Sequence, residues 1–238
     1  VVKSRNNIDI RHLLNYSIIM KYDNITEAKF IDRPNRFIAH CRVGKITETV
    51  HVKNTGRCRA LLTPEAKVYL EKSDNPNRKT KYDLVAVMKG NTLINMDSQS
   101  PNKAAYQWLC DGNFLAHPTI VKPETKYGNS RFDFYLENEK EKAFVEVKGV
   151  TLEKEGTAMF PDAPTERGTK HLNELISAKK AGYRSAVLFV VQMKGCNEFK
   201  PNTDTDKHFA VALQKANDNG VEVLVYDCKV TPDSMVID

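Results

Sequence analysis

One short stretch of the chain has alternating residues on both sides of a polar loop. In RFDFYLENEKEKAFVEVKGV, residues 131–150, the loop Glu137–Lys142 separates two segments in which every second residue is apolar. This pattern predicts a β-hairpin. If the hairpin closes symmetrically about the loop, Leu136 pairs with Ala143.

That register would bring three charged residues onto one face. Asp133 would lie opposite Glu146, at the roughly 5 Å typical of paired side chains, and Lys148 would follow on the same face. A divalent cation between the carboxylates would relieve their repulsion, and oxygen ligands suit Mg²⁺ or Mn²⁺. With a lysine near the phosphate, these are the parts of a phosphodiester-cleaving site. A solvated face with a Glu146–Lys148 ion pair would give the same spacing.

The residues around this hairpin extend the hypothesis. The opposite face is expected to be core, formed by Phe132, Phe134, Val145 and Val147. Glu124, at the end of the preceding predicted strand, is a further candidate ligand.

A helix is expected from about Glu166 to Ala181, with Leu172, Leu175 and Ile176 as its buried stripe. Arg167, His171 and Glu174 fall on an adjoining stripe. They either reach a phosphate and orient water or are ordinary residues of the helix surface. The candidate catalytic residues are therefore Asp133, Glu146, Lys148, Glu124 and His171.

The elements that position these residues differ between the two halves of the chain. Short strands with turn-forming residues between them are expected from Asn24 to about Ser98, at Ile25–Phe30, Arg36–Val43, Thr47–Val52, Lys67–Glu71, Leu84–Met88 and Thr92–Asp97. Their number and length favour a five-stranded OB-like barrel. From Pro101 onward helices alternate with strands, which predicts an α/β domain with a mixed sheet. The expected division is an arm at residues 1–20, a barrel at 21–98 and an α/β domain at 99–238.

Charge is distributed unevenly along the chain. Of its net charge of +6, residues 21–103 carry +7, from 16 Lys/Arg and 9 Asp/Glu, and residues 104–238 carry −3, from 17 and 20. A basic front half suits a polyanion, whereas the acidic back half holds the carboxylates.

Cysteine content and hydropathy bear on the compartment. Five scattered cysteines without a C-x-x-C pair favour reduced thiols in the cytoplasm. No apolar run reaches the roughly 20 residues of a membrane helix. Residues 1–19, which begin with Val, are interpreted as an extension of the protein or a non-native arm.

Several long motifs resemble the sugar fermentation stimulation protein A family. They are PNRFIAHCRV, KNTGRCRALL, SDNPNRKTKYDLVAV, KYGNSRFDFYL, FVEVKGVTL, MFPDAPTERGTKHLNEL, LFVVQMKG and GVEVLVYDCKVTP, in order from about Met20 to Pro232. The resemblance implies an N-terminal OB-like domain and a C-terminal domain of the PD-(D/E)xK nuclease fold. It also implies DNA binding with little sequence preference and a role in regulating sugar-utilisation genes. The nuclease motif falls on Asp133, Glu146 and Lys148, and Gly149 stands where family members often have Asn.

Basic residues in or beside the predicted turns are the expected DNA contacts. They are Arg33, Arg36, Arg57, Arg59, Arg78, Lys79 and Lys81, with Arg167 in the second domain. Phe37 or Tyr82 could stack on a base, although alternating aromatic residues normally belong to a core.

The leading hypothesis is a DNA-binding protein with a Mg²⁺- or Mn²⁺-dependent nuclease-type site, and whether it is an enzyme stays open. One alternative is a non-catalytic, sequence-tolerant DNA-binding regulator. A more distant one is a small-molecule enzyme acting on a sugar phosphate. RNA as a partner and the oligomeric state, with a homodimer among the options, also stay open.

Overall fold

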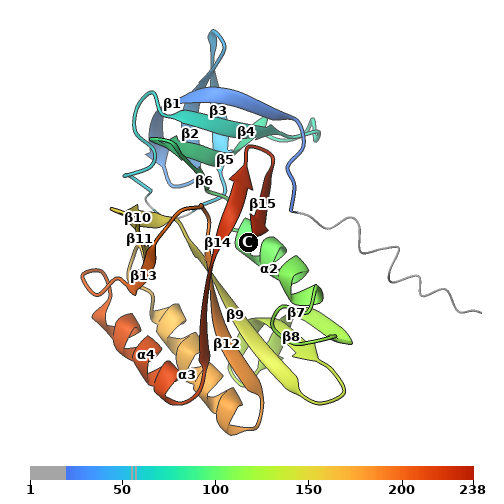
Figure 1. Cartoon of the computed structure of the whole chain (residues 1–238). Coiled ribbons are helices and arrows are strands. Elements are labelled where there is room, and N and C mark those ends of the chain that lie inside the picture. Colours follow the sequence, from blue (N-terminus) through green and yellow to red (C-terminus); the bar gives the residue numbers. More distant parts are fainter. Residues whose placement is uncertain (1–19, 55, 57) are drawn as a thin grey trace, which may run out of the picture.

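The structure is a computed structural model that describes residues 20–54, 56 and 58–238. The arm expected at residues 1–20 therefore lies outside the described residues except for Met20, and so does the candidate DNA contact Arg57. The described chain forms a β-barrel and, below it in Figure 1, an α/β domain. No helix in the described part is long and apolar enough to cross a membrane.

Five strands close the barrel, and a sixth extends it. The strands are β1 (Ile25–Asn35), β2 (Ile38–Val43), β3 (Ile46–Val52), β4 (Lys67–Lys72), β5 (Tyr82–Lys89) and β6 (Thr92–Asn95). Neighbours pair in the order β3-β2-β1-β4-β5-β6, and a parallel pairing of β3 with β5 closes the ring. The alternation seen in the sequence points apolar side chains inward, and Ala39, Cys41, Val50, Val68 and Leu70 are fully buried.

The second domain is built on a six-stranded mixed sheet. Its strands are β7 (Ile120–Tyr127), β8 (Ser130–Glu137), β9 (Lys142–Val150), β12 (Arg184–Val191), β14 (Glu222–Thr231) and β15 (Ser234–Ile237), in the order β15-β14-β12-β9-β8-β7. The central strand β12 is parallel to both β9 and β14. The strands at either side pair antiparallel.

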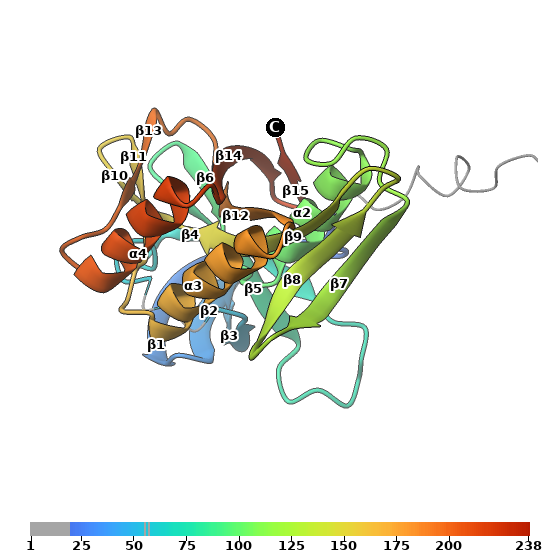
Figure 2. The ribbon, with the colours of Figure 1, turned by 90° about the horizontal axis from the view of Figure 1, so that it is seen from below.

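Helices cover both faces of this sheet. Ala186, Leu188 and Val190 of β12 point toward α2 (Ser100–Cys110), while Val187 and Phe189 point toward the other two helices. Those are α3 (Glu166–Lys180) and α4 (Lys207–Asp218), which lie side by side in Figure 2. Because β12 is buried on both faces, its sequence is continuously apolar instead of alternating.

Four short strands were not expected from the sequence. A small sheet contains β10 (Leu152–Lys154), β11 (Thr157–Phe160) and β13 (Glu198–Pro201), and β15 forms an antiparallel pair with β14. Each has three or four residues, which is too few for a pattern of period two to stand out.

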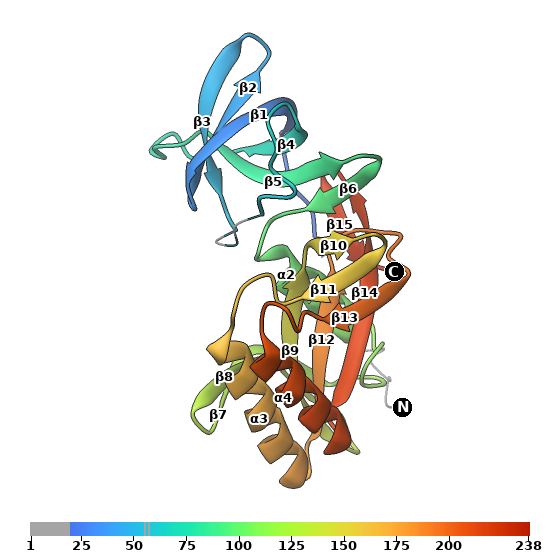
Figure 3. The same ribbon diagram turned by 90° about the vertical axis from the view of Figure 1, so that its left-hand side faces the viewer.

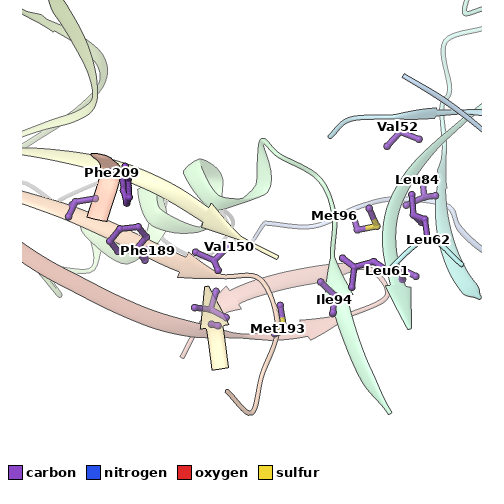
Figure 4. Packing of buried hydrophobic residues seen from close by; sticks show 14 of the residues in the cluster. Val52, Leu61, Leu62, Leu84, Ile94, Met96, Val150, Phe189, Met193 and Phe209 are labelled. Carbon is purple, nitrogen blue, oxygen red and sulfur yellow. The ribbon is translucent and has the colours of Figure 1, made fainter. Parts of the chain in front are cut away.

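The two domains share one apolar core. Buried residues run from Phe209 and Phe189 through Val150 and Met193 to Ile94 and Met96 of the barrel (Figure 4). A backbone hydrogen bond from Asn95 N to Gln192 O, 2.9 Å long, also joins the domains. Figure 3 shows β6 lying next to the small sheet at this junction.

Candidate metal and nucleic-acid site

The β8–β9 hairpin has the expected register near its loop, but it opens before the acidic residues. Leu136 pairs with Ala143 and Phe134 with Val145, and the ladder of paired residues ends there. The expected pairing of Asp133 with Glu146 is therefore wrong. β9 stays paired with β12 up to Val150, so the two arms of the hairpin diverge. A space for polar groups arises where the arms separate.

Asp133 closes the end of this ladder with its side chain. Its Oδ2 accepts a hydrogen bond of 2.8 Å from the backbone N–H of Val147, and its Oδ1 accepts one of 2.8 Å from the Asn102 amide of α2. Burial, followed by the neighbouring charge of Glu146, raises the pKa of Asp133 above its ordinary value. The charge of Glu146 therefore acts on Asp133, although the two residues are not paired in the ladder.

Glu146 is 3% exposed, and its two oxygens have different surroundings. Oε1 accepts hydrogen bonds from Lys148 Nζ, at 2.6 Å, and from His171 Nδ1. Oε2 is buried and has no hydrogen-bond partner among the described residues. Burial alone would raise the pKa of Glu146, but the contacts with His171 and Lys148 outweigh it, so that the pKa is lowered. Glu146 is thus kept ionised with one oxygen available.

His171 reaches Glu146 from α3. Arg167 Nε, one turn earlier, lies 3.5 Å from His171 Nε2, so the tautomer that fits both contacts carries its proton on Nδ1. The start of α3 is fixed by Thr165, whose hydroxyl accepts from Gly168 N at 3.0 Å. A Cβ on Gly168 would lie 2.9 Å from Thr165 and 3.1 Å from Phe209, so glycine permits this tight packing.

This donor set fits a divalent cation. Glu146 Oε2 is a buried carboxylate oxygen without a hydrogen-bond partner among the described residues, and oxygens of this kind beside a second carboxylate are suitable ligands for a divalent cation. No group of three or more His, Cys, Asp or Glu side chains is arranged to hold a metal within residues 20–54, 56 and 58–238. Proteins nevertheless often bind Mg²⁺ through only two carboxylates, because the ion keeps several water ligands and bonds to substrate phosphate.

Two other glutamates predicted to lie near the site, Glu124 and Glu174, are placed beside other parts of the protein. Glu124 lies at an irregular position of β7 with φ 55°, is exposed, and pairs with Arg131 at 2.6 Å. Glu174 is half-buried, with its Oε2 near the turn at Gly128.

The hydrophobic residues of the hairpin are buried as expected, but not on one face. Phe134, Val145 and Val147 lie in the cluster beside α2. Phe132 instead packs against Phe144 and His171, on the α3 side, with ring centroids 5.2 and 6.3 Å apart. The expectation of a single core face was therefore wrong for Phe132, because the strand changes its orientation where the hairpin opens.

Two arginines predicted to contact DNA, Arg33 and Arg78, form hydrogen bonds within the protein. The Arg33 guanidinium donates to the carbonyl oxygens of Gly56, Asn54 and Arg36 at 2.6–2.8 Å. Arg78 forms a pair of hydrogen bonds with buried Asp83, at 2.6 and 2.8 Å. Burial would raise the pKa of Asp83, but Arg78 and His51 bring it down to about 2. These arginines stabilise the loops of the barrel.

Other basic residues face solvent. Arg36, Arg59, Lys79 and Arg167 are exposed, and exposed Lys81 pairs with Glu48 at 3.1 Å.

Phe37 is 50% exposed at the β1–β2 turn, 5.4 Å from the Arg36 guanidinium, so the expectation that it belongs to the core was wrong. Half-buried Tyr82 packs against the core as expected.

Two polar residues near the site were not selected from the sequence. Asn102 orients Asp133, and nothing in the local pattern of the helix marks it. Gln192 directly follows the apolar run of β12 and is 2% exposed. A polar residue just past the carboxyl end of a buried parallel strand is a signal that could have identified it.

Comparisons with known proteins agree with this architecture. The description "SfsA N-terminal OB domain" matches residues 31–96, and "Sugar fermentation stimulation protein RE domain" matches residues 99–234. The expected fold class, an OB barrel followed by a restriction-endonuclease-like mixed α/β domain, is confirmed.

Several proteins are similar to this chain over nearly its whole length. A sugar fermentation stimulation protein homolog of Clostridium beijerinckii is 55% identical over 218 residues, covering 92% of this chain and 96% of the relative. One from Desulfitobacterium hafniense (strain Y51) is 56% identical, covering 91% and 94%. The solved structure of Pyrococcus furiosus SfsA in complex with Ca²⁺ is 27% identical, with a TM-score of 0.82, and the match covers 92% of this chain and 95% of that one.

Proposed function

The chain belongs to the sugar fermentation stimulation protein family, and we propose that it binds DNA and hydrolyses phosphodiester bonds with a divalent metal held by Asp133 and Glu146. One observation carries the proposal. Glu146 is buried and ionised, with Oε2 lacking a partner among the described residues, directly beside a second carboxylate and a lysine.

A metal at these residues is supported by their chemistry and by the Ca²⁺ complex of the Pyrococcus furiosus relative. Mg²⁺ or Mn²⁺ is the proposed working ion, since both favour carboxylate and water oxygens in octahedral arrangements. Such an ion supplies a more acidic bound water and stabilises negative charge on the phosphoryl oxygens.

The protein's own groups have separate tasks. Asn102 and the Val147 N–H hold Asp133 in position, and His171 holds Glu146. Lys148, whose side chain is 14% exposed, donates a hydrogen bond to Glu146 and presents positive charge to the scissile phosphate. Arg167, exposed beside His171, binds a neighbouring phosphate.

Binding depends on the barrel. Exposed Arg36, Arg59, Lys79 and Lys81 contact backbone phosphates, and Phe37 stacks on a base. Contacts of this kind give affinity that falls with salt concentration and depends little on base sequence.

The test is a cleavage assay on single-stranded, duplex and branched DNA with Mg²⁺ and with Mn²⁺. Wild type should degrade at least one substrate, and Asp133→Ala should lose at least a hundredfold in rate while retaining DNA in a gel-shift assay. Lys148→Met should also lose activity, because it removes the positive charge placed beside the scissile phosphate. Lys170→Met, on the exposed side of α3, is the matched control.

The possible failures separate the alternatives. Salt-sensitive DNA binding without cleavage under all conditions would leave a non-catalytic regulator, in which the Lys148–Glu146 ion pair is structural. Tighter binding of RNA than of DNA in a competition assay would identify RNA as the nucleic acid that the protein binds. Absence of DNA binding at low salt would end the proposal and favour a small-molecule substrate such as a sugar phosphate.

A further inference from the structure

A cavity of about 190 Å³ lies between the barrel and the α/β domain. One wall is the chain from Gly149 to Leu152, which begins at the residue after Lys148. The Cα atoms of Lys148 and Gly149 are consecutive and therefore about 3.8 Å apart, so this wall begins one residue after the proposed catalytic lysine. The opposite wall comes from the barrel, through Asn54, Gly56 and Ser98.

Glycines bring these walls close together. A Cβ on Gly149 would lie 2.6 Å from Gln192 Oε1 and 2.7 Å from Pro101 Cγ. A Cβ on Gly56 would lie 2.6 Å from Asp162 Oδ2, which belongs to the other domain. Gly56 therefore permits the close approach of the barrel to Asp162, and Gly149 permits tight packing within its own wall.

The lining combines apolar surface with hydrogen-bond acceptors. Met159 and Phe160 supply the apolar part, and Phe160 is held from behind by Phe189 and Phe209, with ring centroids 5.5 and 5.1 Å away. Asp162 contributes a carboxylate. Gln192 donates through Nε2 to Asn95 and Asp97, which leaves Oε1 as its acceptor facing Gly149.

This chemistry defines the occupant. A carboxylate on the wall disfavours a phosphate, whereas a flat ring with N–H donors on its edge satisfies both parts of the lining. The volume of about 190 Å³ is of the size that a single base fills. Enzymes acting on nucleic acid commonly accommodate a single unstacked base in such a cavity.

We propose that the cavity between Asn54 and Gly56 on one side and Gly149–Leu152 on the other binds one base of the strand whose phosphate lies at Lys148, and that Asp162 accepts a hydrogen bond from the amino group of that base. The inference rests on the proposed nucleic-acid function and adds a subsite to it. Cytosine, adenine and guanine are then preferred over uracil and thymine, which lack an amino group and whose N3–H donor lies between two carbonyl oxygens that the Asp162 carboxylate repels.

Isothermal titration calorimetry of the full chain with Ca²⁺ tests the subsite without requiring cleavage. The ligands are deoxycytidine 5′-monophosphate, deoxyuridine 5′-monophosphate and deoxyribose 5-phosphate, which share the sugar and the phosphate. Wild type should bind the cytidine nucleotide at least tenfold more tightly than the sugar phosphate and at least threefold more tightly than the uridine nucleotide.

Two variants locate the binding. Thr151→Trp fills the cavity and should reduce cytidine nucleotide affinity to that of the sugar phosphate, while Lys154→Trp, exposed three residues later, should leave it unchanged. Asp162→Ala changes an exposed side chain and should abolish the preference for cytidine over uridine. Equal binding of all three ligands by wild type, no binding of any, or unchanged binding by Thr151→Trp would overturn the subsite.

The same proteins in the cleavage assay separate the two proposals. If wild type cleaves no DNA but shows the expected nucleotide preferences, only the catalytic proposal fails. If wild type cleaves DNA and Asp133→Ala does not, but Thr151→Trp binds nucleotides as wild type does, only the base subsite fails.

Discussion

At the scale of single residues, the carboxylate of Glu146 as the proposed metal ligand combines two requirements that usually conflict. A buried carboxylate tends to become protonated, yet a metal ligand must be ionised. His171 and Lys148 resolve the conflict through Oε1, and they leave Oε2 available. Replacing a residue that holds a metal ligand in position through a hydrogen bond commonly lowers metal affinity by about 10- to 100-fold.

The main expected effect of replacing His171 is therefore weaker metal binding. In His171→Ala the donor to Glu146 Oε1 is lost, and we expect the affinity for Mn²⁺ to fall about ten- to hundredfold. Calorimetry with Mn²⁺ measures this directly. His171→Asn places an amide N–H near the position of Nδ1 and should recover much of the affinity.

Thermal unfolding of the variants distinguishes a role of His171 in positioning Glu146 from a role in folding. Both variants should keep a cooperative thermal transition without metal, since the change removes the contacts of one side chain and leaves the pairing of β9 intact. If Ala and Asn bind Mn²⁺ as tightly as wild type, His171 is a core residue and has no role in holding Glu146.

At the scale of elements, the position of each functional group follows from where strands separate or turn. The β8–β9 ladder ends after Phe134, and α2 supplies Asn102 at that point. In the barrel, Asn35 forms the β1–β2 turn by accepting hydrogen bonds from the backbone N–H groups of Phe37 and Ile38, at 2.9 and 3.1 Å. This turn presents Phe37 to solvent.

An exposed aromatic ring on a barrel turn should contribute stacking energy to DNA binding. We expect Phe37→Ala to weaken binding of a single-stranded oligonucleotide about 5- to 100-fold, from roughly 1–3 kcal/mol per stacked base. Fluorescence anisotropy at fixed salt measures the change. Ile46→Ala is the matched control, since Ile46 is 65% exposed at the next turn and has no aromatic ring.

The salt dependence adds a second check. Phe37→Ala should leave the slope of log affinity against log salt unchanged, because no phosphate contact is removed. Equal affinities of Phe37→Ala and Ile46→Ala would place the bound strand elsewhere on the protein.

At the scale of the whole molecule, Gln192 connects the barrel to the six-stranded sheet of the second domain. Its side-chain amide donates to the Asn95 and Asp97 carbonyl oxygens, both at 3.1 Å, and it lies 3.3 Å from Ser100 Oγ. The same residue forms part of the wall at Gly149. A single buried side chain thus sets the distance between the domains beside Lys148.

Removing this link should cost stability. In Gln192→Ala several buried acceptors lose a donor, and we expect the free energy of unfolding to fall by about 1–3 kcal/mol. Guanidinium chloride unfolding measures it. Gln214→Ala, at an exposed position of α4, removes a surface amide and should change little. Equal stability of the two variants would show that the amide of Gln192 contributes nothing to the junction.

The sequence by itself determined what depends on local periodicity and on long motifs. Alternation of period two gave the hairpin register at Leu136 and Ala143, and it marked the barrel strands. The motifs indicated the family, and with it the fold class. Asp133, Glu146 and Lys148 were selected as candidates from their types and spacing, although the expected pairing of Asp133 with Glu146 was wrong.

Only the tertiary structure decided which polar groups meet across long separations. His171 reaches Glu146 over 25 residues, Asn102 reaches Asp133 over 31, and Gln192 reaches Asn95 over 97. Arg33 and Arg78 looked like DNA contacts until their partners within the barrel were known. The order of residue types along a chain indicates which positions are buried and where turns form. The partner of a long polar side chain depends instead on how separate elements pack.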